Sequence, residues 1–241
     1  VTLASIKENY RIIICNDGST DKTQEILEKY SKTIPLEIIQ HKVNRGLGET
    51  IRDLFERAAA ISSEEDIIIR FDCDDTHEPK YISLLINKIR SGYDVVTASR
   101  FEKGGGQYGV NIYRSFISRC ANLFMSIFFS ITGIKDYSCG YRAYNSKIIK
   151  KAISFYANDF IQLKGLGFTC TLEKLVKLKI IGARFGEIPF ELRYDQKVSD
   201  SKMVSSITTL GYFVMTILYH WPLGGWKYLY KKKLKNDKIN Y

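Results

Sequence analysis

Residues 66–75 read DIIIRFDCDD, an apolar β-branched run that ends directly in a cluster of carboxylates. A short run of this kind predicts a buried strand. Pro79 follows, and then Ile82, Leu85, Ile86 and Ile89 recur at the spacing of a helix that buries one face. A strand, a polar loop and a helix in this order are the repeating unit of an α/β fold.

The same unit occurs twice upstream. Residues 11–15 (RIIIC) run into the loop 16–19 (NDGS), and residues 36–40 run into the Gly-containing loop 44–48 (NRGLG). Residues 93–99 (YDVVTAS) are a fourth strand candidate. We therefore predict a Rossmann-like, mostly parallel sheet flanked by helices, with ligands at the carboxyl ends of its strands. The side chains predicted at that edge are Asp17, Asp72 and Asp74.

Composition narrows the class of protein and the partners. The 241 residues are 45% hydrophobic and 13% aromatic, enough for a substantial core. A net charge of +10 suits a partner that carries phosphate, which is a nucleic acid, a nucleotide or an anionic membrane. The five cysteines are scattered without a CxxC pair, so they predict neither a disulfide framework nor a zinc site and favour a reducing, cytoplasmic setting.

The C-terminal part has a different character. Residues 203–226 contain no Asp, Glu, Lys or Arg, and several lysines follow. Ser, Thr, Gly and Pro dilute this stretch, so we favour an interfacial helix or hairpin over a membrane span. We expect a main domain over residues 1–203 and a membrane-interface segment over residues 204–241.

The pair Asp72 and Asp74 is the strongest chemical signal. Two carboxylates separated by one residue at a strand end offer the hard oxygen ligands that Mg²⁺ or Mn²⁺ prefers, and the ion would bridge to a diphosphate. A solvated acidic turn is the alternative for an isolated DxD. The upstream loop 16–21 (NDGSTD), predicted at the same sheet edge, favours the metal site.

Further motifs carry a family resemblance over about residues 5–205. They are 16–21 (NDGSTD), 71–79 (FDCDDTHEP), 98–101 (ASRF), 114–122 (RSFISRCAN), 138–142 (SCGYR), 187–190 (EIPF) and 201–203 (SKM). With them the chain resembles family 2 glycosyltransferases of the GT-A fold, in the dolichyl-phosphate mannosyltransferase and polyprenyl-phosphate glycosyltransferase branch. Members begin with a strand that carries a PxYNE-type motif, and none precedes Arg11, so we expect the first βα unit to be missing.

The resemblance implies roles for individual residues. It assigns nucleotide-sugar binding to Asp17, Gly18, Ser19, Asn44, Gly46, Asp72, Arg100, Arg193 and Lys202. It assigns acceptor binding to Arg114, Ser118 and Glu173, metal binding to Asp72 and Asp74, and catalysis to Asp72, Asp74, Arg114 and Ser118. Asp75 and Thr76 depart from the family pattern, which usually has an apolar residue and then Gln or Ser at these positions.

The implied reaction is inverting transfer of a sugar from a GDP- or UDP-linked donor to a polyprenyl phosphate. An ionised phosphate acceptor needs no strong general base, and no catalytic His or Cys pair is evident in the sequence. The resemblance places the protein at the cytoplasmic face of a membrane, peripheral or weakly anchored, in cell-envelope glycan synthesis.

The sequence has three alternative interpretations. A family 2 enzyme with a saccharide or other acceptor would need Asp17, Asp72 and Asp74 but not Arg114 and Ser118. A non-catalytic, membrane-associated homologue is the second. A nucleic-acid-binding protein is disfavoured, because carboxylates at the predicted site edge would repel a polyanion.

Overall fold

The computed structural model describes residues 8–197 and 205–239. Its elements are, in chain order, β1 (Ile12–Asp17), α2 (Thr23–Ser31), β2 (Leu36–His41), α3 (Leu47–Ile61), β3 (Ile67–Arg70), η1 (Pro79–Tyr81), α4 (Ile82–Arg90), β4 (Val95–Ser99), β5 (Gly106–Tyr108), α5 (Ile112–Phe129), β6 (Arg142–Asn145), α6 (Ser146–Tyr156), η2 (Ala157–Phe160), α7 (Thr169–Ile180), β7 (Phe185–Pro189), β8 (Glu191–Arg193), η3 (Tyr194–Gln196), α8 (Ser205–His220) and α9 (Gly225–Ile239). The predicted α/β fold is confirmed.

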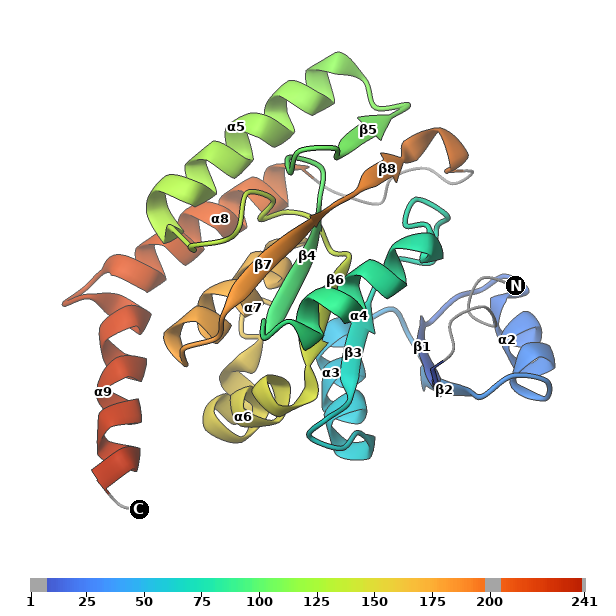
Figure 1. The fold of residues 1–241 in the computed structure, drawn as a ribbon, viewed down its shortest axis with the longest axis horizontal. Helices are drawn as coiled ribbons and strands as arrows, with labels where there is room; N and C mark the ends of the chain where they lie inside the picture. The colour runs from blue at the N-terminus through green and yellow to red at the C-terminus, as the bar shows by residue number, and fades with distance from the viewer. Residues whose placement is uncertain (1–7, 198–204, 240–241) are drawn as a thin grey trace.

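In the part of the chain that the structure describes, the strands form three hydrogen-bonded sheets. The central sheet has the order β3-β6-β4-β7, and β1-β2 and β5-β8 are parallel two-stranded sheets (Figure 1). In the central sheet β4 and β7 are parallel, whereas β6 runs antiparallel to β3 and β4. The four strands predicted from apolar runs are present as β1 to β4. The antiparallel β6 was not predicted, because Arg142, Ala143, Tyr144 and Asn145 form no apolar run.

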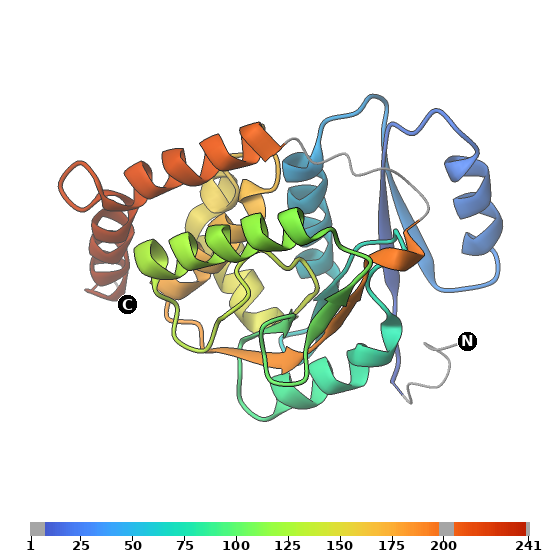
Figure 2. The ribbon, with the colours of Figure 1, turned by 90° about the horizontal axis from the view of Figure 1, so that it is seen from above.

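Helices cover both faces of the central sheet. On one face α4 packs through Ile82, Leu85, Ile86 and Ile89, whose spacing places them on one side of the helix. The other face carries α3, α6 and α7 (Figure 2). Between these layers β4 is fully enclosed, and all five of its residues are buried.

A buried arginine joins the sheet to the helical layer. Arg142 of β6 is 0% exposed, and its guanidinium donates to Thr97 Oγ1 (3.1 Å), the Thr171 carbonyl (2.8 Å) and the Tyr137 carbonyl (2.7 Å). Three neutral oxygens thus satisfy a charge that would otherwise be costly to bury. β4, β6, the start of α7 and the loop before β6 are held together by this one side chain.

The C-terminal helices α8 and α9 form a hairpin against the rest of the molecule. α8 contacts α5 and α7, and α9 contacts α7. The predicted boundary between residues 203 and 204 lies outside the described residues. Among the helices of the described ranges, none has both the length and the apolar content required to cross a bilayer.

Candidate functional site

The loop after β1 forms a polar pocket with the loop after β2. Gly18 has φ +69°, a conformation that favours glycine, and a Cβ atom there would lie 2.5 Å from the Asn44 backbone nitrogen. The loops therefore approach more closely than another residue would allow. They enclose about 300 Å³ lined by Asp17, Gly18, Ser19, Thr20, Asp21 and Asn44.

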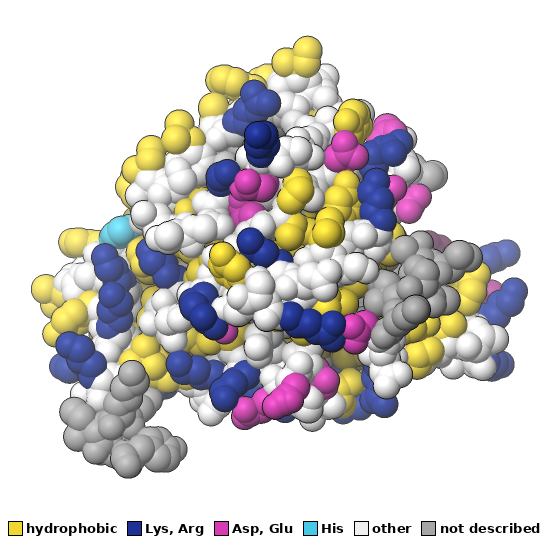
Figure 3. Space-filling view, viewed as in Figure 1, with side chains coloured by type: hydrophobic (Ala, Val, Ile, Leu, Met, Phe, Trp, Pro, Cys, Tyr) yellow, Lys and Arg dark blue, Asp and Glu magenta, His cyan; other side chains and the backbone are white. Residues whose placement is uncertain are grey.

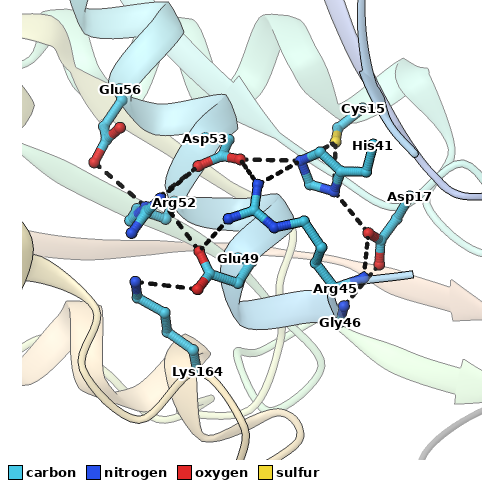
Figure 4. Close-up of polar contacts among 10 residues, drawn as sticks. All are labelled: Cys15, Asp17, His41, Arg45, Gly46, Glu49, Arg52, Asp53, Glu56 and Lys164. Carbon is cyan, nitrogen blue, oxygen red and sulfur yellow. Dashed lines mark hydrogen bonds and ion pairs between the residues drawn. The ribbon is translucent and has the colours of Figure 1, made fainter. Parts of the chain in front are cut away.

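Asp17 is held rigidly at the edge of this pocket. Its Oδ1 lies 2.7 Å from His41 Nδ1 and accepts from the Arg45 amide (2.8 Å), and its Oδ2 accepts from the Gly46 amide (2.9 Å) (Figure 4). Burial would raise the pKa of Asp17, but these hydrogen bonds outweigh burial and lower it. A carboxylate offers about four acceptor positions, so about one remains for a ligand.

The DxD loop follows β3. Asp72 Oδ1 accepts from Arg70 Nη2 (2.6 Å), and the Asp72 amide donates to His77 Nδ1 (2.9 Å). Asp74 accepts from the Thr76 hydroxyl (2.6 Å) and from the Lys197 ammonium. Burial would raise the pKa of Asp74, but the bonds from Lys197 and Thr76 lower it. Both predicted metal ligands are therefore carboxylates already paired with cations of the protein.

The DxD loop also contains the two departures from the family pattern. Asp75 has φ +64° and so takes a left-handed conformation that is uncommon outside glycine. Thr76 is buried and bonds Asp74 rather than solvent. Within residues 8–197 and 205–239, no group of three or more His, Cys, Asp and Glu side chains could hold a metal ion.

The segment β8–η3 brings three predicted site regions together. The Arg193 amide donates to the Thr76 carbonyl (3.3 Å), and Lys197 reaches Asp74. One residue after Arg193, the Tyr194 hydroxyl accepts from Arg114 Nη1 (3.1 Å) at the start of α5. Arg193, the DxD loop and Arg114 therefore lie in one neighbourhood.

Other predicted residues vary in placement. The Arg193 guanidinium donates a hydrogen bond to the Asp195 carboxylate. Ser118 lies on α5, one turn beyond Arg114, and is partly buried. Lys202 lies outside the described residues. Glu173 is 0% exposed, and its two oxygens accept from the Gln162 and Leu163 amides (2.8 and 3.0 Å). In this arrangement Glu173 supports a loop and has no free surface for an acceptor.

Arg100 likewise has a partner inside the protein. Its Nε and Nη2 donate to the two oxygens of Asp136 (2.7 and 2.8 Å), and Nη2 also donates to Ser138 Oγ (2.7 Å). Asp136 is fully buried, and the Arg100 side chain is 11% exposed. Two of the three guanidinium nitrogens of Arg100 are thus bonded within the protein.

Sequence reasoning missed His41, Asp53, Asp136 and Lys197. His41 ends β2 and lies between Asp17 and Asp53, with Nε2 2.9 Å from Asp53 Oδ2 (Figure 4). A histidine that ends the strand predicted over 36–40 and stands three residues before the glycine loop 44–48 was the available signal for it. No local pattern pointed to Asp136 and Lys197, because their partners Arg100 and Asp74 are 36 and 123 residues away. Asp53 was missed because its contact with His41 joins α3 to the end of β2.

Comparison with known proteins identifies the relatives of the chain. The sequence profile described as glycosyl transferase family 2 matches residues 1–153, which is more than half of the chain. Dolichol-phosphate mannosyltransferase of Pyrococcus furiosus is 29% identical over 183 residues, which are 76% of this chain and 47% of that protein. This chain thus spans about half the length of that relative. An uncharacterized protein of Methanocaldococcus jannaschii is 27% identical over 79% of this chain and 73% of its own length.

Solved structures share the fold at low sequence identity. Glucosyl-3-phosphoglycerate synthase of Mycobacterium tuberculosis, in complex with Mn²⁺, uridine diphosphate and phosphoglyceric acid, aligns with TM-score 0.53 and 14% identity over 86% of this chain and 66% of that one. TarS 1–349 of S. aureus, in complex with uridine diphosphate, aligns with TM-score 0.50 and 14% identity over 91% of this chain and 65% of that one. These likenesses show a GT-A fold.

Proposed function

Because the chain belongs to glycosyl transferase family 2, we propose that it transfers a sugar from a GDP- or UDP-linked donor to a polyprenyl phosphate. The observation that carries the proposal is the pocket at Asp17, in a chain whose DxD loop and Arg114 are joined through β8–η3. The P. furiosus relative is named for transfer to dolichol phosphate, which supports this class of acceptor.

The donor nucleoside is assigned to the pocket after β1. Asp17 keeps an acceptor position for a ring N–H or a ribose hydroxyl, and its other positions are occupied by His41, Arg45 and Gly46. Gly18, Ser19 and Asn44 line the same pocket. Arg193 and Lys202 are assigned to the donor phosphates, since guanidinium and ammonium groups suit phosphate oxygens.

Asp72 and Asp74 fit a Mg²⁺ or Mn²⁺ ion that takes its remaining ligands from a diphosphate. Mg²⁺ is commonly bound by one or two carboxylates together with substrate phosphates, which agrees with the lack of a larger ligand cluster among the described residues. Arg70 and Lys197 show that both carboxylates already accept cationic partners. When bound, the ion would neutralise charge on the departing diphosphate.

The chain's own residues account for the rest of the reaction. A phosphate oxygen of the acceptor forms a bond to the anomeric carbon as the bond from that carbon to the donor diphosphate breaks, with inversion. Arg114 and Ser118, one helical turn apart on α5, bind and orient the acceptor phosphate. The ionised phosphate is itself the nucleophile, so no side chain has to remove a proton.

An exposed apolar surface supports a position at a membrane. On α5, Ile112, Phe116, Leu123 and Ile127 are 62–88% exposed and share one face of the helix, and Leu210, Phe213 and Ile217 of α8 are 53–57% exposed. The rings of Phe124 and Phe213, 5.4 Å apart, connect the two helices. Figure 3 shows hydrophobic side chains along the edge over α5 and Lys or Arg side chains over α9.

The charge on these helices suits an anionic membrane. α5 has two arginines and no acidic residue, and α8 has no Asp, Glu, Lys or Arg. Apolar helix faces bordered only by cations bind the interface of anionic bilayers. We therefore place the protein at the cytoplasmic face of a membrane, peripheral or weakly anchored. Sedimentation with anionic and zwitterionic vesicles tests this: Phe116→Glu should lose binding, and Ile26→Glu on the exposed face of α2 should not.

The proposed function is tested by thermal unfolding with GDP, UDP and their sugars, each with and without Mn²⁺. One nucleotide at about 100 times its Kd should raise Tm by about 5 °C or more in the presence of metal. Asp72→Ala and Asp74→Ala should abolish the part of this rise in Tm that depends on the metal. Glu64→Ala, at an exposed carboxylate paired with Lys147, is the matched control and should retain it.

Transfer of labelled sugar then identifies the acceptor. Label that enters the organic phase with polyprenyl phosphate, and is not competed by saccharides, supports the proposal. Transfer only to a saccharide would make the chain a family 2 enzyme with another acceptor. The absence of any nucleotide-dependent shift would refute the donor site itself.

A further inference from the structure

The turn between α8 and α9 exposes apolar side chains at one end of the molecule. Trp221 directly follows α8 and is 70% exposed. Leu223, at 90%, is the most exposed large hydrophobic side chain among the residues that the structure describes. Tyr228 in the first turn of α9 is 55% exposed, and it lies beside the turn, because a Cβ atom on Gly224 would lie 2.9 Å from the Tyr228 Cβ. Three large side chains therefore face solvent around one turn.

Packing beneath the turn holds it in place. Trp226 is 8% exposed, and the Lys177 ammonium lies 4.3 Å from the centre of one of its rings. A Cβ atom on Gly225 would overlap the Leu218 carbonyl oxygen, so the turn folds closely onto α8. The exposed side chains thus project from a packed scaffold.

Cations border the same turn. Residues 205–236 contain no Asp or Glu, and the five lysines among them all lie on α9. Two of them, Lys227 and Lys231, lie near Lys179 of α7, whose pKa is lowered by burial and then by these two charges. The Lys179 ammonium donates to two carbonyls at the C-terminal end of α5 (2.7 and 3.0 Å). The lysines of α9 therefore have no carboxylate within residues 205–236 to neutralise them.

The turn also continues the apolar faces of α5 and α8. His220 Nε2 lies 2.8 Å from the Phe128 carbonyl oxygen, which joins the end of α8 to the end of α5. Ile127 and Phe128 are 66% and 39% exposed there. In both Figure 1 and Figure 2 the turn lies at the opposite end of the molecule from α2. Exposed apolar side chains thus extend from α5 to the turn, and neither α5 nor α8 contains an acidic residue.

An anionic bilayer fits this surface better than a second copy of the chain does. Two copies that met through the turn would bring the lysines of both α9 helices together, and each copy has a net charge of +10. Tryptophan and tyrosine rings are typical of a membrane interface, where they lie at the level of the headgroups. Lysines beside them pair with lipid phosphates.

We propose that the turn between α8 and α9 inserts into the interface of an anionic bilayer. Leu223 lies among the acyl chains, Trp221 and Tyr228 lie at the headgroups, and the lysines of α9 bind lipid phosphates. This inference rests on the proposed position at a membrane and adds a second contact to the apolar faces of α5 and α8. Two separate contacts fix the orientation of the protein on the bilayer, which a single helix face would leave free to tilt.

The chain has only two tryptophans, so fluorescence can follow the turn directly. In Trp226→Phe the emission comes from Trp221 alone, and phenylalanine keeps a ring beside the Lys177 ammonium. Phosphatidylglycerol vesicles should shift this emission to shorter wavelength, and bromine on the acyl chains should quench it. Trp221→Phe is the matched control, because the remaining Trp226 is buried and its emission should barely change.

Affinity for the same vesicles measures the contribution of each side chain. Leu223→Glu should weaken binding at least about tenfold, because the burial of one leucine is lost. Lys227→Gln and Lys231→Gln should each weaken binding about fivefold, and neither should change binding to phosphatidylcholine vesicles. Ile26→Glu and Lys29→Gln, both at exposed positions of α2, are the matched controls and should bind as the wild type does.

The outcomes separate this inference from the proposed function. If the protein sediments with neither kind of vesicle, the membrane position and this inference both fail, while the nucleotide experiment still decides whether the donor site exists. If the protein sediments and Phe116→Glu abolishes binding, but Trp221 emission neither shifts nor is quenched, the inference alone is refuted. An emission shift that grows with protein concentration without vesicles would show self-association and would also refute it. Should Trp226→Phe fail to fold, the difference in emission between wild type and Trp221→Phe gives the same measurement.

Discussion

The buried pair of Arg100 and Asp136 leads to a quantitative prediction for Asp136→Asn. The substitution removes the negative charge and leaves the guanidinium, only 11% exposed, without a counter-ion. Removing one partner of a buried ion pair costs about 3–5 kcal/mol of unfolding free energy. For a domain of this size that lowers Tm by on the order of 10 °C.

The chain contains a matched control for this prediction. Arg90 and Glu8 form a two-point contact of nearly the same geometry (2.7 and 3.0 Å), but their side chains are 56% and 39% exposed. Glu8→Gln removes the same kind of charge at a site where water solvates the arginine, so Tm should barely change. Circular dichroism melts of both variants measure the difference. Equal shifts in the two variants would refute the argument that burial sets the cost.

Acid titration of the same variant checks the sign of the electrostatic contribution. Burial would raise the pKa of Asp136, but the charge and hydrogen bonds of Arg100 outweigh it and lower the pKa. The carboxylate therefore adds stability above the usual aspartate pKa of about 3.9, and this stability is lost as pH falls through the lowered value. The difference in unfolding free energy between wild type and Asp136→Asn should narrow on acidification. A constant difference would contradict this assignment.

Three further predictions concern other parts of the molecule. Gly18→Ala places a Cβ atom 2.5 Å from backbone of the neighbouring loop in a left-handed conformation, so nucleotide affinity by calorimetry should fall at least about tenfold; unchanged affinity would contradict the pocket. Glu173→Gln leaves the fully buried Lys177 without its charge partner. Unfolding in urea should show a loss of about 3 kcal/mol in unfolding free energy, and a loss under about 1 kcal/mol would contradict a stabilising role of the pair. Burial raises the pKa of Cys139 to about 12, so iodoacetamide should label the exposed Cys120 and spare Cys139 by mass spectrometry until the protein unfolds; rapid labelling of Cys139 would show that it is not buried.

Local pattern was sufficient for much of the fold. The runs before Asp17 and Asp72 are short, apolar and stopped by polar loops, and β1 and β3 lie where these runs predicted them. Helix α4 follows the same logic, because its apolar residues repeat at helical spacing. The antiparallel strand β6 could not be predicted in this way. It lies between β3 and β4, but Arg142 and Asn145 interrupt the apolar run that would indicate a buried strand.

The candidate site was predictable only where its residues share a loop. Asp17, Gly18 and Ser19 are contiguous in sequence, and they line one pocket. Arg100 was expected at the donor phosphates because a motif contains it, yet its partner Asp136 is 36 residues away. A side chain's partner depends on tertiary packing, which residue type and spacing do not reveal.

Arg142 has a consequence for how the molecule opens. Its three hydrogen bonds reach β4, the loop before β6 and the first turn of α7, so separating any of these segments exposes a charged group that has lost its partners. Amide hydrogens in protected segments exchange with solvent only when the structure opens. Those of β4, β6 and the start of α7 should therefore exchange together, in one cooperative event close to global unfolding, whereas β1 and β2, which are hydrogen-bonded only to each other within the described sheets, can open separately.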